Sequence, residues 1–318
     1  MKIVFHGANA KTFLPGFADL LDTPHDLLPL SDTLFETGET EALASADVVI
    51  GVHYSADFPE LSARLYQVPG AGYDGIDIAA LPKGCALCNV FGHEGAIAEY
   101  VMAALLSRHV PLAEADRQLR AGDWHYWAGK PTGLRTELSA QSIGIVGFGH
   151  IGKAVAARCL AFGMTVHVAN RSTVTDKGVA AHPLTDLEQM AGEVDFLINT
   201  LPLAETTQGL IGKDVLVAMK PGAVILNVGR GPVIDETALY TTLKEGRISA
   251  IIDTWYVYPG ADNPNPHPGT LPFHDLPNVI LTPHMSGWTQ GTIDRRRADM
   301  AANINRLVRG QALQNRVT

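Results

Sequence analysis

From residue 142 onward, the chain alternates short, continuously apolar runs with segments of helical periodicity. Such runs are typical of parallel strands buried on both faces of a sheet, with helices as the crossover connections. Six of them in alternation with helices predict a doubly wound parallel sheet, and so an α/β fold, for this part of the chain. The expected strands are Ser142–Val146, Thr165–Ala169, Phe196–Thr200, Val224–Val228, Ala250–Asp253 and Val279–Thr282.

The first third of the chain shows a shorter series of the same kind. Its expected strands are Lys2–Phe5, Asp47–Gly51 and Ala86–Val90, with helical stretches between them. A chain of 318 residues is longer than most single cores support, so this series predicts a second, smaller α/β unit. The fold class is therefore α/β with two parallel-sheet domains.

Two further segments suggest how these domains are connected. Glu94 to Arg120 has apolar residues at helical spacing and predicts one long helix that links the domains. The amphipathic tail Asp294–Leu313 also predicts a helix, which we expect to return and pack on the first domain. We therefore expect a discontinuous domain of residues 1–93 and 287–318, and a second domain of residues 94–286. The stretch Pro259–Pro277 contains six prolines and is therefore predicted to be a long irregular loop.

Charge and composition narrow the classes of partner. The formal net charge of −9 argues against nucleic acid and anionic membranes as partners, although one basic group can still dominate a small pocket. The chain shows no signal peptide and no window close to the roughly 18 apolar residues of a membrane span, so we expect a cytoplasmic protein. Cys85 and Cys88 stand alone as a C-x-x-C pair, which we interpret as small buried residues, and we expect no metal site.

A glycine motif lies between the first strand and the first helix of the longer series. Gly147, Gly149 and Gly152 form G-x-G-x-x-G, with His150 and Ile151 between the last two glycines. The first glycine permits a tight turn, the second lets a pyrophosphate approach the backbone, and the third lets helix and strand pack closely. The helix N-terminus then favours the anion. This context predicts a dinucleotide-binding domain of the Rossmann type.

The end of the next strand bears on the choice between NAD(H) and NADP(H). Domains that prefer NAD place a carboxylate there to bind the ribose hydroxyls. Here the strand ends at Asn170, followed by Arg171, Ser172 and Thr173, and the next carboxylate is Asp176. An arginine can pair with a 2′-phosphate, and hydroxyls can donate to it. We therefore predict that NADP(H) is preferred, with NAD(H) as the alternative cofactor.

Several further motifs, in one order along nearly the whole chain, resemble those of the D-isomer-specific 2-hydroxyacid dehydrogenases. The resemblance implies two Rossmann-like domains with an active site in the cleft between them, a small 2-keto or 2-hydroxy acid substrate such as glyoxylate or hydroxypyruvate, and a homodimer. The exposed-looking aromatic stretch Trp124–Trp127 also favours a dimer. The motifs are Gly70–Asp77, Ile97–Glu99, Glu137–Leu138, Leu201–Leu203, Met219–Ala223, Asn227–Asp235 and Thr282–Gly287.

Two side chains are candidates for the chemistry of keto acid reduction. Arg230 follows an expected strand at the edge where α/β sheets bind ligands, and its planar guanidinium suits a carboxylate. His284 lies in Pro283–Gly287, which resembles the family's catalytic histidine motif. An imidazole can give or take a proton at physiological pH.

The same resemblance implies roles for other residues. Ala71 and Gly72 fall where family members donate backbone N–H groups to the substrate carboxylate. Asp253 resembles the family's partner of the nicotinamide carboxamide. The remaining residues expected to contact the cofactor are Leu201, Pro202, Val228 and Gly287.

One position departs from the family pattern. Most members carry a Glu immediately before the proline in the segment after Asp253, and here Tyr258 stands there. A phenol is neutral at pH 7 and cannot stabilise an imidazolium as a carboxylate does, so Asp253, Asp262 and Asp275 are the candidates for a substitute charge. Formate dehydrogenase-like members also lack this Glu. A formate- or phosphite-type dehydrogenase and a non-catalytic dinucleotide sensor therefore remain open as alternatives.

Overall fold

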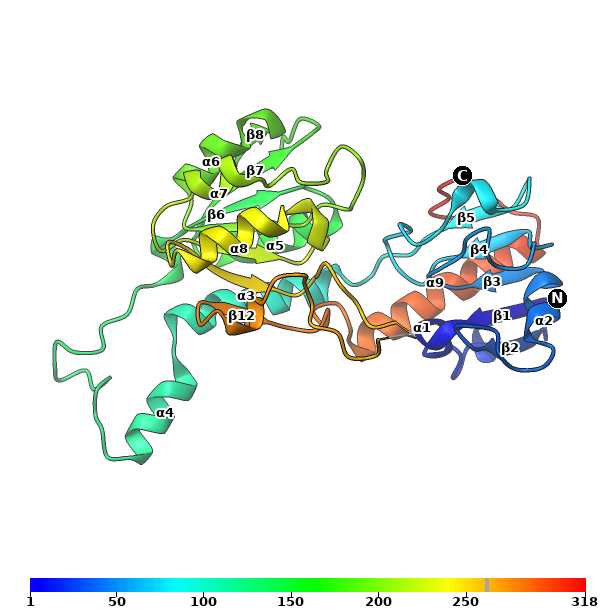
Figure 1. Ribbon diagram of the computed structural model, residues 1–318, viewed down its shortest axis with the longest axis horizontal. Coiled ribbons are helices and arrows are strands. Elements are labelled where there is room, and N and C mark those ends of the chain that lie inside the picture. The colour runs from blue at the N-terminus through cyan, green and yellow to red at the C-terminus, as the bar shows by residue number, and fades with distance from the viewer. Residues whose placement is uncertain (261–262) are drawn as a thin grey trace. The chain divides into compact units, whose positions relative to one another are not determined.

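Figure 1 presents a computed structural model of the chain, which describes residues 1–260 and 263–318. These residues divide into two compact units. Met1–His93 and Trp288–Thr318 form the first, and Glu94–Gly287 form the second. The chain therefore leaves the first unit once, completes the second, and returns.

The first unit is built on a parallel sheet with the strand order β2-β1-β3-β4-β5. Strands β2 and β4 were not predicted from the sequence. Strand β2 contains Pro29 and lies at the sheet edge, where a missing ladder hydrogen bond is tolerated. The strands of this sheet are β1 (Lys2–His6), β2 (Asp26–Leu30), β3 (Val48–Ile50), β4 (Leu65–Gln67) and β5 (Ala86–Cys88).

Helices α1 (Gly7–Lys11), α2 (Glu39–Ala44) and α9 (Gln290–Val308) complete the first unit. Helix α9 belongs to this unit because its apolar face is part of the core: Met300 and Ile304 pack in one cluster with Ile3 and Phe5 of β1. Figure 1 shows α9 beside the strands of this sheet. Two arginines of α9, Arg295 and Arg296, donate hydrogen bonds to the backbone carbonyls of Gly92 and Phe91. These bonds connect the helix to the end of the stretch Met1–His93.

The second unit contains the larger parallel sheet, with the order β12-β11-β10-β9-β6-β7-β8 among the described strands. The chain runs outward from β6 to β8, then crosses back and runs outward from β9 to β12. The reversal lies between β6 and β9, and such a switch point is where open α/β sheets bind ligands. The strands are β6 (Ser142–Val146), β7 (Thr165–Asn170), β8 (Val179–Pro183), β9 (Phe196–Asn199), β10 (Val224–Asn227), β11 (Ser249–Ile252) and β12 (Val279–Leu281).

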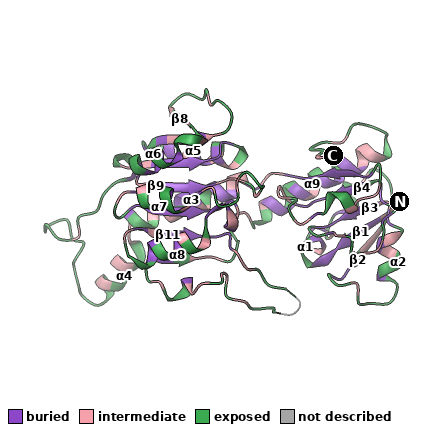
Figure 2. Cartoon of the chain, turned by 45° about the horizontal axis from the view of Figure 1, so that its top comes forward, coloured by how far each residue is buried: buried purple, intermediate pink, exposed green. Residues whose placement is uncertain are grey.

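Helices cover both faces of this sheet. One core cluster joins the sheet to α6 (Leu187–Glu193), α7 (Lys213–Ala218) and α8 (Glu236–Lys244). The other joins it to α3 (Glu94–His109) and α5 (His150–Ala161). Figure 2 shows the strands as buried and much of the outer helix surface and the loops as exposed. The two α/β domains with parallel sheets that the sequence predicts are thus confirmed.

The single long helix expected over residues 94–120 is wrong. Helix α3 ends at His109, and α4 (Leu112–Arg120) starts after Pro111. Proline has no N–H to donate, and it disfavours helical backbone in the residue before it, so the helix breaks here. Helix α4 has no buried residue, and Figure 1 shows it extending away from the sheet of the second unit together with the segment that follows.

Other expectations need smaller corrections. Strand β8 was missed because Val179–Pro183 is an edge strand without an apolar run. The proline-rich stretch holds a short 3-10 helix, Phe273–Asp275, within otherwise irregular structure. Cys85 and Cys88 are free and buried, and burial raises the pKa of each thiol to about 11. Within residues 1–260 and 263–318, no helix is both long enough and apolar enough to cross a bilayer.

Candidate active site

The glycine motif forms the turn between β6 and α5, at the switch point of the larger sheet. Gly147 has a φ of +95°, which favours glycine, and a Cβ there would lie 2.8 Å from a methyl group of Leu201, the residue after Thr200 beyond β9. A Cβ on Gly152 would collide with the carbonyl oxygen of Gly147. These two glycines are therefore required by the packing of the turn itself.

Gly149 differs, because a Cβ there would meet no atom within 4 Å. Packing within the described protein does not require a glycine at this position, whereas the approach of a ligand to the backbone would. Gly149 is the N-cap of α5, which starts with His150 and Ile151, and the first turn contains no acidic side chain. The N-terminus of this helix thus suits an anion, and the turn fits a dinucleotide pyrophosphate.

The end of β7 lies next to this turn. The side-chain oxygen of Asn170 accepts a hydrogen bond from the N–H of Phe148 at 3.2 Å, and its amide nitrogen donates to the hydroxyl of Ser172 at 2.9 Å. Asn170 therefore connects the glycine turn to the loop that follows β7. Arg171 is exposed in that loop. A cation and a hydroxyl occupy the region where NAD-preferring domains carry a carboxylate.

Two buried asparagines, to which the sequence analysis assigned no role in the site, position Arg230. Asn199 ends β9 and Asn227 ends β10, and the amide of Asn199 donates to the side-chain oxygen of Asn227 at 2.9 Å. Both amides also donate to the carbonyl oxygen of Arg230, at 3.3 and 3.2 Å. A Cβ on Gly231 would collide with the carbonyl of Trp255. A polar residue at the end of an otherwise apolar strand was the signal that could have identified this pair.

The loop that contains His284 is hydrogen-bonded to the carboxylate of Asp253. Both residues follow neighbouring strands, β11 and β12. Asp253 is fully buried and accepts hydrogen bonds from the N–H groups of Met285 and Ser286, each at 2.9 Å, and from the hydroxyl of Thr282 at 2.6 Å. These bonds fix the backbone on the C-terminal side of His284.

His284 itself has a left-handed backbone, with a φ of +55°. Such a conformation is uncommon outside glycine and costs free energy, so it persists only where the surrounding structure imposes it. The hydrogen bonds to Asp253 supply that constraint. Strained backbone of this kind concentrates at functional sites, which makes His284 a stronger candidate than its sequence alone did.

Tyr258 contacts His284 directly. Its phenol oxygen lies 2.9 Å from Nδ1 of the imidazole, and it also accepts a hydrogen bond from the N–H of Trp255 at 3.0 Å. The indole of Trp255 in turn donates to the carbonyl of Thr282 at 2.8 Å. Tyr258 thus orients the imidazole, although it brings no negative charge to it.

Of the three aspartates considered as substitute charges, Asp253 directs its oxygens at Thr282 and at the backbone beyond His284. Asp275 is exposed and lies 3.7 Å from His274. Asp262 lies outside the described residues.

The sequence model of the NAD binding domain of D-isomer specific 2-hydroxyacid dehydrogenases matches residues 102–286, more than half of the chain. The chain belongs to this family. As a member, it is an enzyme, an oxidoreductase whose second unit binds a nicotinamide dinucleotide.

Named relatives of this dehydrogenase agree with that assignment. The chain is 34% identical over 289 residues to glyoxylate/hydroxypyruvate reductase B of Pectobacterium atrosepticum, and the match covers 86% of each chain. Among solved structures, it resembles an NADPH-dependent glyoxylate/hydroxypyruvate reductase of Sinorhizobium meliloti in complex with NADP and malonate (26% identity, TM-score 0.79, 99% and 96% of the two chains). It also resembles an acyclic imino acid reductase in complex with NADPH and D-Arg (25% identity, TM-score 0.80, 100% of both chains).

In the dehydrogenase's first unit, Ala71 and Gly72 lie in a loop whose backbone carbonyl groups accept hydrogen bonds from residues after β5. Asn89 donates to the carbonyl of Ala71 at 2.7 Å, and the N–H of Val90 donates to that of Gly70 at 3.0 Å. Within the described residues, the N–H groups of Ala71 and Gly72 have no acceptor. They are therefore available as donors to a ligand.

Other predicted cofactor contacts of the dehydrogenase lie at the ends of strands. Leu201 and Pro202 follow β9, and Val228 follows β10. Gly287 lies in the loop between β12 and α9. The carboxyl ends of these parallel strands share one edge of the sheet with the glycine turn.

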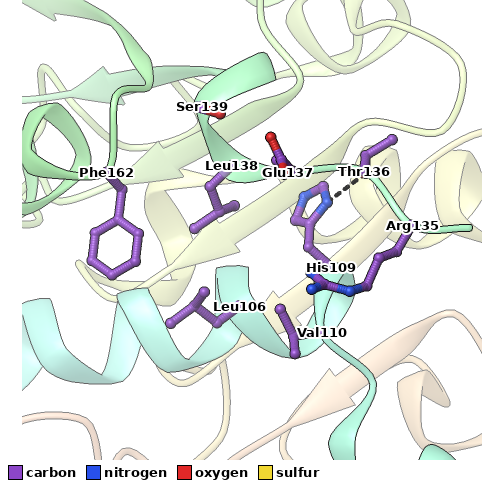
Figure 3. Close-up of a pocket in the computed structure, with 9 residues that line it drawn as sticks. All are labelled: Leu106, His109, Val110, Arg135, Thr136, Glu137, Leu138, Ser139 and Phe162. Atoms are coloured by element: carbon purple, nitrogen blue, oxygen red, sulfur yellow. Dashed lines mark hydrogen bonds between the residues drawn. The ribbon is translucent and has the colours of Figure 1, made fainter. Parts of the chain in front are cut away.

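A separate pocket of the dehydrogenase contains none of the predicted site residues. It measures about 210 Å³ and lies between the end of α3 and the segment before β6. Figure 3 shows Leu106, Leu138 and Phe162 on one side of it, and His109, whose Nδ1 lies 2.6 Å from the hydroxyl of Thr136, on the other. This pocket lies next to the start and end of residues 112–134, which comprise α4 and the segment after it and are called the α4 segment below.

Proposed function

We propose that this enzyme reduces a small 2-keto acid, such as glyoxylate or hydroxypyruvate, with NADP(H). The observation that carries the proposal is the placement of Arg230 and His284 after β10 and β12, which flank β11 in the sheet. A cation for a carboxylate and an imidazole for proton transfer therefore share the carboxyl edge of the sheet with the dinucleotide turn.

The proposed roles follow from the chemistry of these groups. The reduced nicotinamide supplies the hydride when the cofactor is bound. Arg230 binds the substrate carboxylate and polarises the carbonyl, and the N–H groups of Ala71 and Gly72 donate further hydrogen bonds to the carboxylate. With Nδ1 of His284 bonded to Tyr258, we assign Nε2 as the atom that delivers the proton to the developing alkoxide.

The preference for NADP(H) rests on the loop after β7. Arg171 and the hydroxyl of Ser172 can bind a 2′-phosphate, and Asn170 leaves this region without the carboxylate that would repel it. Two similar solved structures, which contain NADP or NADPH, support the same choice.

A second candidate reaction is the reduction of a 2-imino acid, favoured by the Tyr258–His284 pair. A protonated imine already carries its proton, so hydride addition to its carbon gives a neutral amine without a proton from the enzyme. A neutral phenol next to the imidazole is then sufficient, whereas a charged general acid would be better supported by a carboxylate. The likeness to an acyclic imino acid reductase agrees with this alternative.

One assay separates the candidates. The purified enzyme is supplied with NADPH and glyoxylate, hydroxypyruvate or pyruvate, each with and without methylamine, and cofactor oxidation and products are followed. Turnover to the 2-hydroxy acid without amine supports keto acid reduction. Turnover only with amine, giving the N-methylamino acid, supports imine reduction. Formate and phosphite with NADP and NAD are the remaining arms, and activity only there would refute both proposals.

We also propose that the enzyme is a homodimer in which the α4 segment contacts a second copy of the chain. Leu112, Leu119, Trp124, Trp127 and Leu134 are all at least half exposed on this segment. A helix of nine residues is marginal in water by itself, and its own unit buries none of its residues. A second copy would cover this apolar surface and stabilise the segment.

A further inference from the structure

Three side chains with metal-binding atoms meet at the β8 edge of the larger sheet. His167 comes from β7, His182 from β8, and Glu193 is the last residue of α6. His167 and His182 lie on the same face of the two parallel strands, because His182 is in register with Ala169, two residues along from His167. Figure 1 shows β7, β8 and α6 next to one another. None of these residues belongs to the proposed active site.

The ligand atoms are close enough to share one ion. Nδ1 of His167 lies 3.0 Å from Nε2 of His182 and 3.8 Å from a carboxylate oxygen of Glu193, and the three ligand atoms lie within 4.8 Å of one another. Two nitrogens bound to one ion at about 2.05 Å are separated by about 2.9 Å at a right angle and about 3.3 Å at a tetrahedral angle. The observed separation of the nitrogens falls between these values. The carboxylate is partly exposed, so it can move the roughly 0.5 Å or more that coordination requires.

The surroundings favour this arrangement. Gln189 donates to the other oxygen of Glu193 at 3.0 Å, the kind of outer contact that orients a metal-binding carboxylate. His167 and His182 are both half-buried, so the packing around them restricts the positions of their imidazoles. The ammonium group of Lys220 is paired with Asp195 at 3.0 Å, which offsets its positive charge.

We propose that His167, His182 and Glu193 bind a divalent transition-metal ion such as Zn²⁺ or Ni²⁺, with water completing its coordination. Two imidazoles and one carboxylate are the donor set that such ions prefer, whereas Mg²⁺ and Ca²⁺ prefer oxygen ligands. The ion would link the edge strand β8 to β7 and α6. This role is structural, and it is independent of the proposed reaction. It departs from the sequence-based expectation that the chain has no metal site.

The test is a titration of EDTA-treated, full-length protein with Zn²⁺ and, separately, Ni²⁺, by calorimetry and by thermal unfolding. We expect one ion per chain and a rise in Tm with metal concentration, because binding to the folded state stabilises it. The His182→Ala and Glu193→Gln variants should each lose at least about tenfold in affinity and most of the rise in Tm. His182 lies on an edge strand and Glu193 is partly exposed, so both variants are expected to fold.

A matched control uses a second pair of neighbouring histidines, His267 and His274. Their rings stack with centroids 3.9 Å apart, and both residues are exposed. The double variant His267→Ala, His274→Ala should bind the ion as the wild type does. The proposal is overturned if the wild type binds neither ion, or if it binds one that the His182 and Glu193 variants bind equally well. Loss of binding in the His267/His274 control alone would place the ion elsewhere and would also refute it.

Discussion

The phenol oxygen of Tyr258 lies 2.9 Å from Nδ1 of His284, and Tyr258 stands at the sequence position where the family resemblance implies a Glu. The phenol orients the imidazole without bringing a negative charge of its own. Orientation and charge can therefore be tested separately in this enzyme.

The Tyr258→Phe variant should remove orientation alone. It deletes a neutral hydrogen bond to His284, worth about 1 kcal/mol, so kcat for keto acid reduction should fall by up to roughly tenfold. The Tyr258→Glu variant instead adds a charge that stabilises the imidazolium, so the pKa of His284 should rise and the decline of activity with rising pH should move to higher pH. Profiles of kcat/KM against pH check both variants. An unshifted profile for Tyr258→Glu would contradict the assigned role of His284.

Arg230 should act on substrate binding and on the carbonyl. Arg230→Ala should raise KM for the keto acid and lower kcat, whereas His284→Ala should mainly lower kcat, by roughly 10²–10⁴-fold. Arg230→Lys should recover little, because an ammonium group cannot make the paired hydrogen bonds of a guanidinium. Steady-state kinetics of the three variants measure this difference. Equal effects on KM from Arg230→Ala and His284→Ala would argue against separate roles.

Substitution of two glycines in the same turn should affect different properties, stability for Gly152 and cofactor binding for Gly149. Gly152→Ala places a methyl group against the carbonyl of Gly147, so it should lower the free energy of unfolding by about 1–3 kcal/mol. Gly149→Ala meets open space, so it should leave stability nearly unchanged and weaken cofactor binding. Thermal unfolding and cofactor titration separate the two effects. Normal cofactor affinity in the Gly149 variant would mean that the pyrophosphate does not approach there.

Arg171 should account for most of the discrimination between the two cofactors. Arg171→Ala is expected to raise KM for NADPH and leave KM for NADH close to that of the wild type, because only NADPH carries the 2′-phosphate. The ratio of kcat/KM values for the two cofactors is the measurement, with Lys177→Ala as a control for a lost positive charge farther along the same loop. A wild-type preference for NADH would mean that the loop after β7 does not select for the 2′-phosphate.

The α4 segment should determine the oligomeric state. Replacing Trp124 and Trp127 by Ser removes aromatic surface that is more than half exposed in the single chain, so the fold should persist while a dimer dissociates. Light scattering at micromolar concentration compares the variant with the wild type, and Leu20→Ser, an exposed apolar residue of the first unit, is the control. A wild-type monomer would refute the dimer.

How much of the fold could be predicted depended on burial. The strands of the larger sheet are apolar because helices cover both faces, so their residues stand out in the sequence, as at Ser142–Val146. Edge strands lack this signal. Strand β2 tolerates Pro29, and β8 has several exposed residues, so both resembled loops. The break at Pro111 was foreseeable, since proline opposes a continuous helix, but the apolar periodicity on either side of it hid the interruption.

By itself, the sequence determined the alternation of strands and helices, the glycine turn at the end of β6, and the motifs that place the chain in its family. These are local properties, carried by consecutive residues. Only the tertiary structure decided which distant side chains meet. It joined Tyr258 to His284, placed Asp253 beneath the histidine loop, paired Asn199 with Asn227, and gathered His167, His182 and Glu193. The register of parallel strands and the packing of helices on them set these contacts, and neither is a property of any single segment.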